Sequence, residues 1–147
     1  MEVSSWFDDE GGKYEVETQS TSMIRYESGA LGIANINQRV VYPKNDLAIF
    51  GTKGRVYGAG LTRSRLDGNL SVLIGDEEKS SFYPQPSGQA HARNIEAFTA
   101  AVLAGEEPNA SGIDGLHSMV FVEAIEKSAT QRRTVEVDYS SIEKLGK

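Results

Sequence analysis

The sequence predicts an α+β fold: an open, largely antiparallel sheet of about six or seven strands with two helices packed on one side. Three observations lead to this class. Polar and apolar residues alternate with a period of two through the first two thirds of the chain. Short turn signals recur between these runs. The last third changes to a helical period, and such segregation of strands and helices is typical of α+β domains.

The first predicted elements form a β-hairpin. Residues 14–26 alternate, with Ile24 on one face and Met23 on the other. The segment "ESGA" follows as a turn in which Gly29 is expected to take a positive φ. "LGIANINQRVV" then returns as a second strand, so residues 14–41 predict a hairpin.

The glycine-rich stretch "AIFGTKGRVYGAG", residues 48–60, has two interpretations. A phosphate-binding loop requires a Gly-Lys-Ser/Thr ending or a third spaced glycine, followed by a helix. Here Lys53 precedes Gly54, Arg63 stands where the third glycine belongs, and the following residues have strand character. We therefore predict two strands joined by a "GTKG" turn, with Gly51 and Gly54 supplying positive φ.

The remaining elements follow in order. "DGN" predicts a hairpin turn between "LTRSRL" and "LSVLI", and "GDEEK" separates the latter from "SSFYP". "HARNIEAFTAAVLAG" has helical spacing and ends in Gly105, a residue suited to a C-terminal cap. "IDGLHSMVFVEAIEKSATQ" predicts a second helix, with Ser111 or Asp114 as its N-cap. "RTVEVD" closes the sheet with Val135 and Val137 alternating.

Composition narrows the class of protein. The 147 residues fit one domain, and the formal net charge of −6 disfavours nucleic acid and anionic membranes as partners. The chain has no cysteine, which suits a reducing cytoplasm. No segment approaches the length of a membrane span, and the N-terminus lacks the pattern of a signal peptide. We expect a cytoplasmic protein.

Few residues suggest catalysis. Of the two histidines, His91 begins the first helix, where it either faces a cleft or lies in water, and His117 is interpreted as a packing or surface residue. The two histidines do not have the spacing of metal ligands, and the sequence does not indicate a Ser-His-Asp catalytic triad. We therefore assign no catalytic and no metal-binding residue.

Three segments together resemble the C-terminal domain of the Gfo/Idh/MocA oxidoreductases. They are "SMIRYESGALGIANI", "LAIFGTKGRVY" and "HARNIEAFTAAVLAGEEPNASGIDGLHSMVFVEAIEKSATQRRTVEVD". The last is the most specific, because it combines a helix ending in glycine, a G-x-D-G turn, a second helix and a V-x-V strand. In order and spacing the resemblance covers residues 16–138.

The resemblance implies one half of a two-domain enzyme. In this family an N-terminal Rossmann domain binds NAD or NADP, and the C-terminal domain contributes to the substrate site and to oligomer contacts. Substrates are sugars, cyclitols or related polyols. This chain lacks the E-K-P lysine and D-x-x-x-H motifs of the family. We therefore expect residues 1–147 to be a single domain without the Rossmann half, to bind no cofactor alone, and to form a homo-oligomer through its sheet face.

The resemblance also points to substrate-binding residues. In family members the segment matching "NQRVVYPKND" reaches toward the sugar, and here it carries Asn37, Arg39, Tyr42 and Lys44, whose side chains can hydrogen-bond hydroxyl groups. His91 is a further candidate. Two alternatives stay open: a freestanding binding or assembly module without redox chemistry, and an unrelated small enzyme built around His91.

Overall fold

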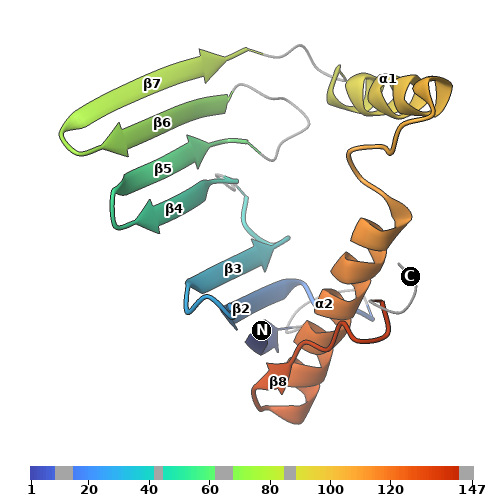
Figure 1. Cartoon of the computed structure of the whole chain (residues 1–147). Helices are drawn as coiled ribbons and strands as arrows, with labels where there is room; N and C mark the ends of the chain where they lie inside the picture. Colours follow the sequence, from blue (N-terminus) through green and yellow to red (C-terminus); the bar gives the residue numbers. More distant parts are fainter. Residues whose placement is uncertain (9–14, 42–44, 62–67, 85–88, 143–147) are drawn as a thin grey trace. The chain divides into compact units, whose positions relative to one another are not determined.

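The computed structural model describes residues 1–8, 15–41, 45–61, 68–84 and 89–142 (Figure 1). The chain divides into two compact units, one formed by residues 1–41 with 110–147 and the other by residues 42–109. Each unit contains an antiparallel four-stranded sheet and one helix. The predicted α+β class is thus confirmed.

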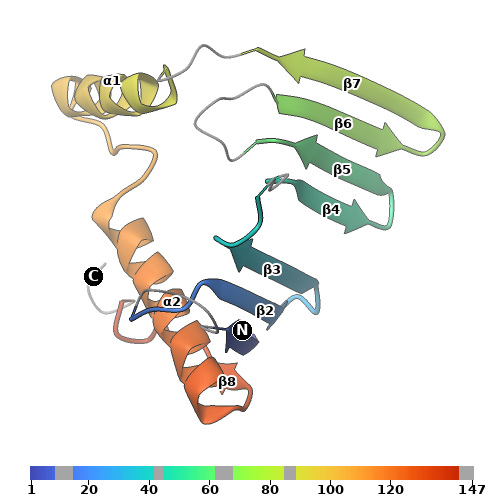
Figure 2. The ribbon, with the colours of Figure 1, turned by 180° about the vertical axis from the view of Figure 1, so that it is seen from behind.

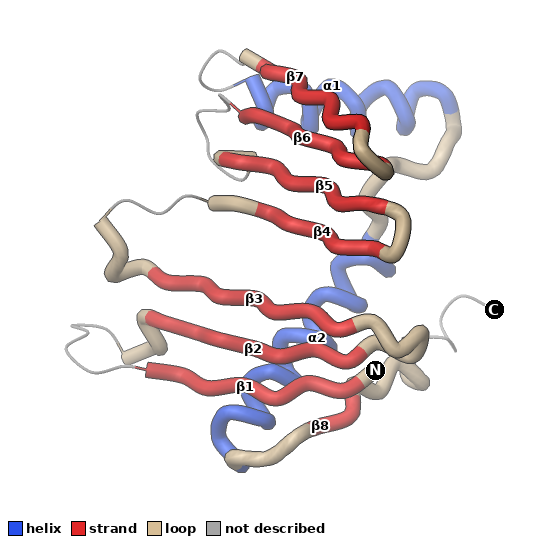
Figure 3. The backbone as a smooth tube through the Cα atoms, turned by 90° about the vertical axis from the view of Figure 1, so that its left-hand side faces the viewer, coloured by secondary structure: helices blue, strands red, loops and turns tan. Residues whose placement is uncertain are grey.

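The first unit contains a sheet in the order β3-β2-β1-β8 (Figure 3). Its strands are β1 (Glu2–Asp8), β2 (Gln19–Arg25), β3 (Leu31–Asn37) and β8 (Val135–Glu136), and every neighbouring pair is antiparallel. The sequence pattern predicts no strand at residues 2–8. This strand, β1, is central, and its inward positions include Ser5, so the apolar alternation that marks a half-buried strand is weak there.

The predicted hairpin of residues 14–41 is present but shorter at both ends. β2 begins at Gln19, and the turn contains Gly29 at φ 85°, as expected. β3 ends at Asn37 because the Asn37 side-chain carbonyl accepts a hydrogen bond from the backbone N–H of Arg39 at 2.8 Å. Such a side-chain turn competes with continued strand pairing.

Helix α2 (Gly112–Gln131) covers one face of this sheet and contacts β1 and β8 (Figure 2). Ser111 is its N-cap, and Asp114 completes a capping box by accepting from the Ser111 backbone N–H, so both residues proposed as caps take part. The core between helix and sheet contains four buried apolar residues: Val3, Ile24, Ala124 and Val137.

The second unit is a meander in the order β4-β5-β6-β7. Its elements are β4 (Leu47–Gly51), β5 (Gly54–Ala59), β6 (Gly68–Ile74), β7 (Glu77–Tyr83) and α1 (Gln89–Ala104). Gly105 follows α1 at φ 68°, which confirms the predicted C-terminal cap. The predicted "DGN" turn falls partly outside the described residues, because Asp67 and most of "LTRSRL" are not among them.

The "GTKG" turn joins β4 to β5, as predicted, but the expected role of its glycines is wrong. Among the glycines that the structure describes, positive φ values occur at Gly29, Gly60, Gly75 and Gly105, and not at Gly51 or Gly54. What Gly54 provides is space, because a Cβ at this position would collide with the backbone carbonyl of Leu73 on β6. Close approach of a neighbouring strand therefore requires this glycine.

Candidate functional site

The structure describes three of the five residues predicted to bind substrate. Asn37 ends β3, and Arg39 follows two residues later. Tyr42 and Lys44 lie outside the described residues. His91 lies in the first turn of α1, in the other unit, with its side chain exposed.

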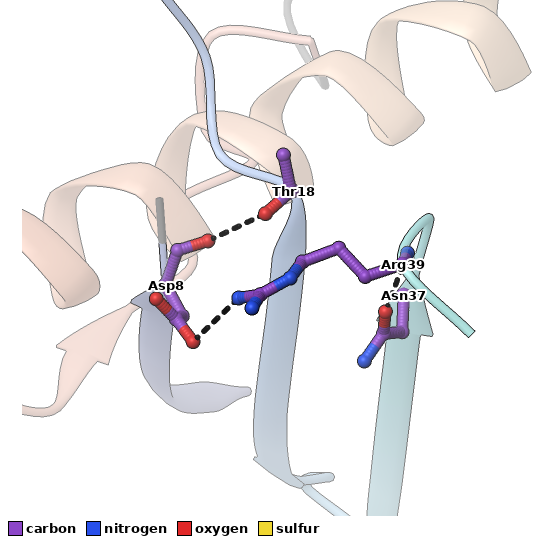
Figure 4. A network of polar contacts seen from close by, with 4 residues as sticks. All are labelled: Asp8, Thr18, Asn37 and Arg39. Carbon is purple, nitrogen blue, oxygen red and sulfur yellow. Dashed lines mark hydrogen bonds and ion pairs between the residues drawn. The ribbon is translucent and has the colours of Figure 1, made fainter. Parts of the chain in front are cut away.

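Asn37 and Arg39 belong to a polar network at one end of the first sheet (Figure 4). The Arg39 guanidinium donates from Nη1 to Oδ2 of Asp8 at 3.2 Å, and the Arg39 backbone N–H donates to Asn37. The guanidinium therefore spans from the end of β3 to the end of β1. Both side chains of the ion pair are about half exposed, at 48% and 46%, so the pair adds little stability and remains accessible to a ligand.

Thr18 holds the backbone of this network in place. Its hydroxyl and its N–H both donate to the Asp8 carbonyl, at 3.2 and 3.1 Å, and its own carbonyl accepts from Gln38 N–H at 2.9 Å. Thr18 is only 6% exposed. The ends of three strands are thereby fixed relative to one another, which positions Asp8 and Arg39. Asp8 is not predictable from the sequence pattern, because β1 itself is not. Thr18 falls inside the predicted strand of residues 14–26, but nothing in the sequence marks its side chain as a structural contact.

A wide depression lies beside this network, between the ends of β1 and β2 and the C-terminal half of α2. Its floor includes Phe7, Thr18, Ile36 and Gln38, and its wall is the C-terminal half of α2. Charged residues of both signs complete the lining, namely Glu15, Glu17, Glu126, Arg132 and Arg133. The depression combines apolar surface with hydroxyl, amide and charged groups, a composition suited to a polar organic molecule.

The second unit contains its own polar cluster. The Tyr57 hydroxyl donates to Oδ2 of Asp46, and this hydrogen bond raises the pKa of Tyr57. The other carboxylate oxygen of Asp46 accepts from the Gly60 N–H at 3.4 Å. Asn45 precedes Asp46 in a left-handed conformation at φ 54°. These contacts fix the chain where the predicted substrate segment enters β4.

His117 contacts another side chain rather than a metal site. Its ring lies edge-on to the ring of Tyr139, with centroids 5.0 Å apart. Partial burial raises the pKa of Tyr139. The interpretation of His117 as a packing or surface residue is consistent with this contact. Within the residues that the structure describes, no three His, Asp or Glu side chains gather as metal ligands would.

The glycine-rich stretch forms two paired strands and the turn between them. Gly51 and Gly54 flank a two-residue hairpin turn, and Gly58 lies within β5. The Leu61 side chain occupies the space beside Gly58 and Gly68, where the Cβ of any other residue would clash with it. A phosphate-binding loop needs free backbone N–H groups and the N-terminus of a helix directly after it. Here β5 is followed by another strand, β6, with which it pairs. The described residues therefore do not fit a dinucleotide at this stretch.

Comparisons with known proteins identify relatives that match most of the chain. No family model matches the sequence. The chain is 26% identical over 138 residues to a myo-inositol 2-dehydrogenase of Thermotoga maritima, covering 89% of this chain and 40% of that protein. A solved aldose-aldose oxidoreductase of Caulobacter crescentus, complexed with glycerol, superposes with a TM-score of 0.78 and 26% identity over 92% of this chain. The chain resembles the C-terminal domain of the Gfo/Idh/MocA oxidoreductases.

A further solved structure supports the same fold. An oxidoreductase of Agrobacterium radiobacter, in complex with NAD+, L-tartaric acid and magnesium, superposes with a TM-score of 0.78 at 21% identity over 92% of this chain. In these comparisons the chain spans between 40% and 43% of the length of the proteins that it matches. The likeness to Gfo/Idh/MocA proteins therefore concerns a part of each enzyme. Neither α1 nor α2 combines the length and apolarity that crossing a bilayer demands.

Proposed function

We propose that this chain is the substrate-side and oligomerisation part of an NAD(P)-dependent oxidoreductase that acts on a sugar, cyclitol or related polyol. The likeness to the aldose-aldose oxidoreductase, which extends over 92% of this chain, is the observation that carries the proposal. Residues 1–147 then act as one domain, in the cytoplasm. The cofactor, NAD or NADP, is bound by a Rossmann domain and not by this part.

The proposed substrate contacts are the predicted residues Asn37, Arg39, Tyr42, Lys44 and His91. Two of them, Asn37 and Arg39, adjoin each other and Asp8 in the structure. Amide, guanidinium and carboxylate groups together offer both donors and acceptors, which a substrate with several hydroxyl groups requires. Their proposed role is to bind and orient the substrate.

A reconstituted enzyme tests this function. The chain is produced together with a Rossmann domain, as one polypeptide or as two, and reduction of NAD+ and NADP+ is followed with myo-inositol and aldoses as substrates. We expect turnover only when both parts are present. Titration of the chain alone with NAD(H) and NADP(H) is expected to show no micromolar binding. Turnover by the chain alone, or none with any Rossmann partner, contradicts the proposal.

A variant pair tests the substrate contacts. Arg39→Met removes the guanidinium from the Asp8 contact, and Arg55→Met removes a similar guanidinium from a Glu78 contact in the other sheet. The two ion pairs have nearly equal lengths, 3.2 and 3.3 Å, and similar exposure. We expect Arg39→Met to raise the KM for substrate about tenfold with a smaller change in kcat, because it loses a charged hydrogen bond. Arg55→Met should leave both parameters unchanged.

A further inference from the structure

Strand β3 is an outer strand of the first sheet, and one edge of its backbone is open. The Tyr26 N–H donates to the Ala30 carbonyl, and the Gln38 N–H donates to the Thr18 carbonyl, both at 2.9 Å. These two bonds bracket β3 and fix its alternation, so the even-numbered residues of β3 bond β2. The N–H and C=O groups of the odd-numbered residues therefore point outward, where the described part of the chain supplies no neighbouring strand.

The side chains of β3 are those of an interior strand rather than of an edge. Ala34 packs against the core beneath α2, so Ile36 lies on that face, and Leu31 and Ile33 lie on the other. Leu31, Ile33 and Ile36 are between 65% and 75% exposed. The strand contains neither a charged residue nor a proline. Apolar side chains on both faces are typical of a strand buried inside a larger sheet.

The other outer strands show how an exposed edge is normally protected. β8 has only two residues, and β7 carries Glu77, Glu78 and Lys79. Short length and charged side chains both prevent an edge from pairing with another strand. β4 is also uncharged, but it has five residues against the seven of β3. Among the described strands β3 is therefore the longest edge without such protection, which marks it as a pairing site.

The size of this edge argues against a second copy of the chain as its neighbour. Seven residues at about 3.3 Å each make an edge about 23 Å long, and a sheet is about 10 Å thick. Edge pairing with a second copy would bury about 500 Å² in total, well below the ~1,200 Å² at which stable interfaces begin. A strand within the same polypeptide needs no such area, because its effective concentration is high. The relatives indicate a source, since this chain spans 40% of the myo-inositol 2-dehydrogenase that it matches.

We propose that the outer edge of β3 receives an extended strand from the polypeptide that carries the Rossmann part. The added strand is uncharged and presents apolar side chains on both faces, beside Ile33 on one face and Ile36 on the other. Its backbone pairs with the outward N–H and C=O groups of β3, the mode of recognition in which a strand is added to an exposed sheet edge. The source of the strand rests on the proposed function, whereas the pairing edge does not.

Amide hydrogen exchange in the 147-residue chain tests the edge directly. The probe is the acetylated peptide KTVTVTVTK, whose valines and threonines favour a strand. Without peptide, we expect the outward amides of Ile33 and Asn35 to exchange at least about tenfold faster than the inward amides of Gly32 and Ala34. Peptide at about ten times its dissociation constant, measured by NMR titration, should slow exchange of the outward amides about tenfold. No slowing at Ile33 and Asn35 overturns the inference.

Two variants at one position provide matched controls. Ile33→Pro removes an outward N–H without removing a bond to β2, a place where edge strands tolerate proline, and Ile33→Ala loses the same side chain but keeps the N–H. We expect Ile33→Pro to weaken peptide binding about tenfold relative to Ile33→Ala, and circular dichroism checks that both fold. Equal peptide binding by the two variants overturns the inference. If Ile33→Pro does not fold, the peptide KTVTPTVTK decides instead, and binding as tight as that of KTVTVTVTK overturns the inference.

The reconstituted enzyme separates this inference from the proposed function. In the active enzyme we expect the Ile33 and Asn35 amides to exchange at least about tenfold more slowly than in the chain alone, without any peptide. Turnover with freely exchanging outward amides leaves the proposed function standing and overturns the inference. Peptide binding at β3, in a chain that yields no turnover with any Rossmann partner, supports the pairing edge and contradicts the proposed function. Protection that rises with chain concentration alone means that a second copy occupies the edge, which overturns the inference.

Discussion

The hydroxyl of Ser128 on α2 accepts a hydrogen bond from the backbone N–H of Ser5 on β1 at 3.0 Å. The same hydroxyl donates to the carbonyl of Arg133 at 2.7 Å, just beyond the end of the helix. The Ser5 side chain in turn shares a hydrogen bond of 2.8 Å with Ser22 on β2. All three serines are at most 5% exposed. A buried line of hydroxyl groups thus connects the C-terminal end of α2 to two strands.

Ser128→Ala is predicted to destabilise the chain. The substitution leaves the buried N–H of Ser5 and the carbonyl of Arg133 without this partner, at a cost of about 1–3 kcal/mol in the free energy of unfolding. Urea unfolding followed by circular dichroism measures the change. Ser118→Ala is the control, because Ser118 is exposed on the same helix and bonds only the Asp114 carbonyl. A Ser128→Ala variant as stable as Ser118→Ala would disprove the buried role.

Gly54 and Gly51 are predicted to differ sharply in their tolerance of alanine. A Cβ at Gly54 collides with the backbone carbonyl of Leu73, whereas a Cβ at Gly51 has its nearest atom at 3.7 Å, an ordinary contact. We expect Gly54→Ala to lower the free energy of unfolding by about 1–3 kcal/mol and Gly51→Ala to change it by less than about 0.5 kcal/mol. Thermal and urea unfolding of both variants test this. Equal effects at the two positions would contradict the close strand approach at Gly54.

The capping box of α2 is predicted to make stability depend on pH. The backbone N–H and hydroxyl of Ser111 lower the pKa of Asp114 below its usual value. The pKa of Asp114 is therefore lower in the folded chain than in the unfolded chain. The contribution of its carboxylate to stability is fully present above the unfolded pKa and is lost as pH falls through the folded pKa.

The corresponding measurement compares the melting temperatures of the wild type and Asp114→Ala. We expect the variant to melt about 2–4 °C lower at pH 7 and the difference to disappear in strong acid. Glu126→Ala, at an exposed position of the same helix, serves as the control and should show no such difference. A wild-type advantage that persists undiminished in strong acid would rule out the carboxylate as its source.

Self-association is predicted to use the apolar face of the second sheet. Strand register places six aliphatic side chains on this face, and three of them, Leu47, Ile49 and Ile74, are more than half exposed. A face of this kind is normally covered by a partner. We expect sedimentation of the wild type as a dimer or larger at tens of micromolar, and of Ile49→Asp as a monomer. Phe50→Asp, on the opposite face, should associate as the wild type does, and a wild-type monomer at high concentration would contradict the prediction.

Local sequence signals predicted most of the elements because short-range chemistry determines them. The hairpin around Gly29, the capped start of α2 at Ser111 and the end of α1 at Gly105 each depend on residues within one turn. The meander of the second unit followed from turn signals in the same way. The sequence alone also shows that this stretch departs from the motif of a phosphate-binding loop, because the comparison needs only the residue types around Lys53 and Gly54.

Other features required the tertiary structure. β1 has serine at a buried position, and its burial is possible only because Ser22 and Ser128, distant in sequence, satisfy the polar groups of Ser5. The sequence singled out Asn37 and Arg39, but not Asp8, which reaches Arg39 only after β1 and β3 flank β2. The sequence marks Gly54 as a turn residue. The reason that this position requires glycine is the close approach of Leu73, which lies on a neighbouring strand.

The sequence by itself determined the α+β class, the order of the predicted elements and the likeness to the Gfo/Idh/MocA oxidoreductases. Hydrophobic periodicity and turn residues are local signals that extend over a few positions, so they can be recognised in a single sequence. Only the tertiary structure decided which polar side chains meet at the end of the first sheet. Such proximity depends on strand pairing between residues far apart in the chain, and local sequence carries no direct record of it.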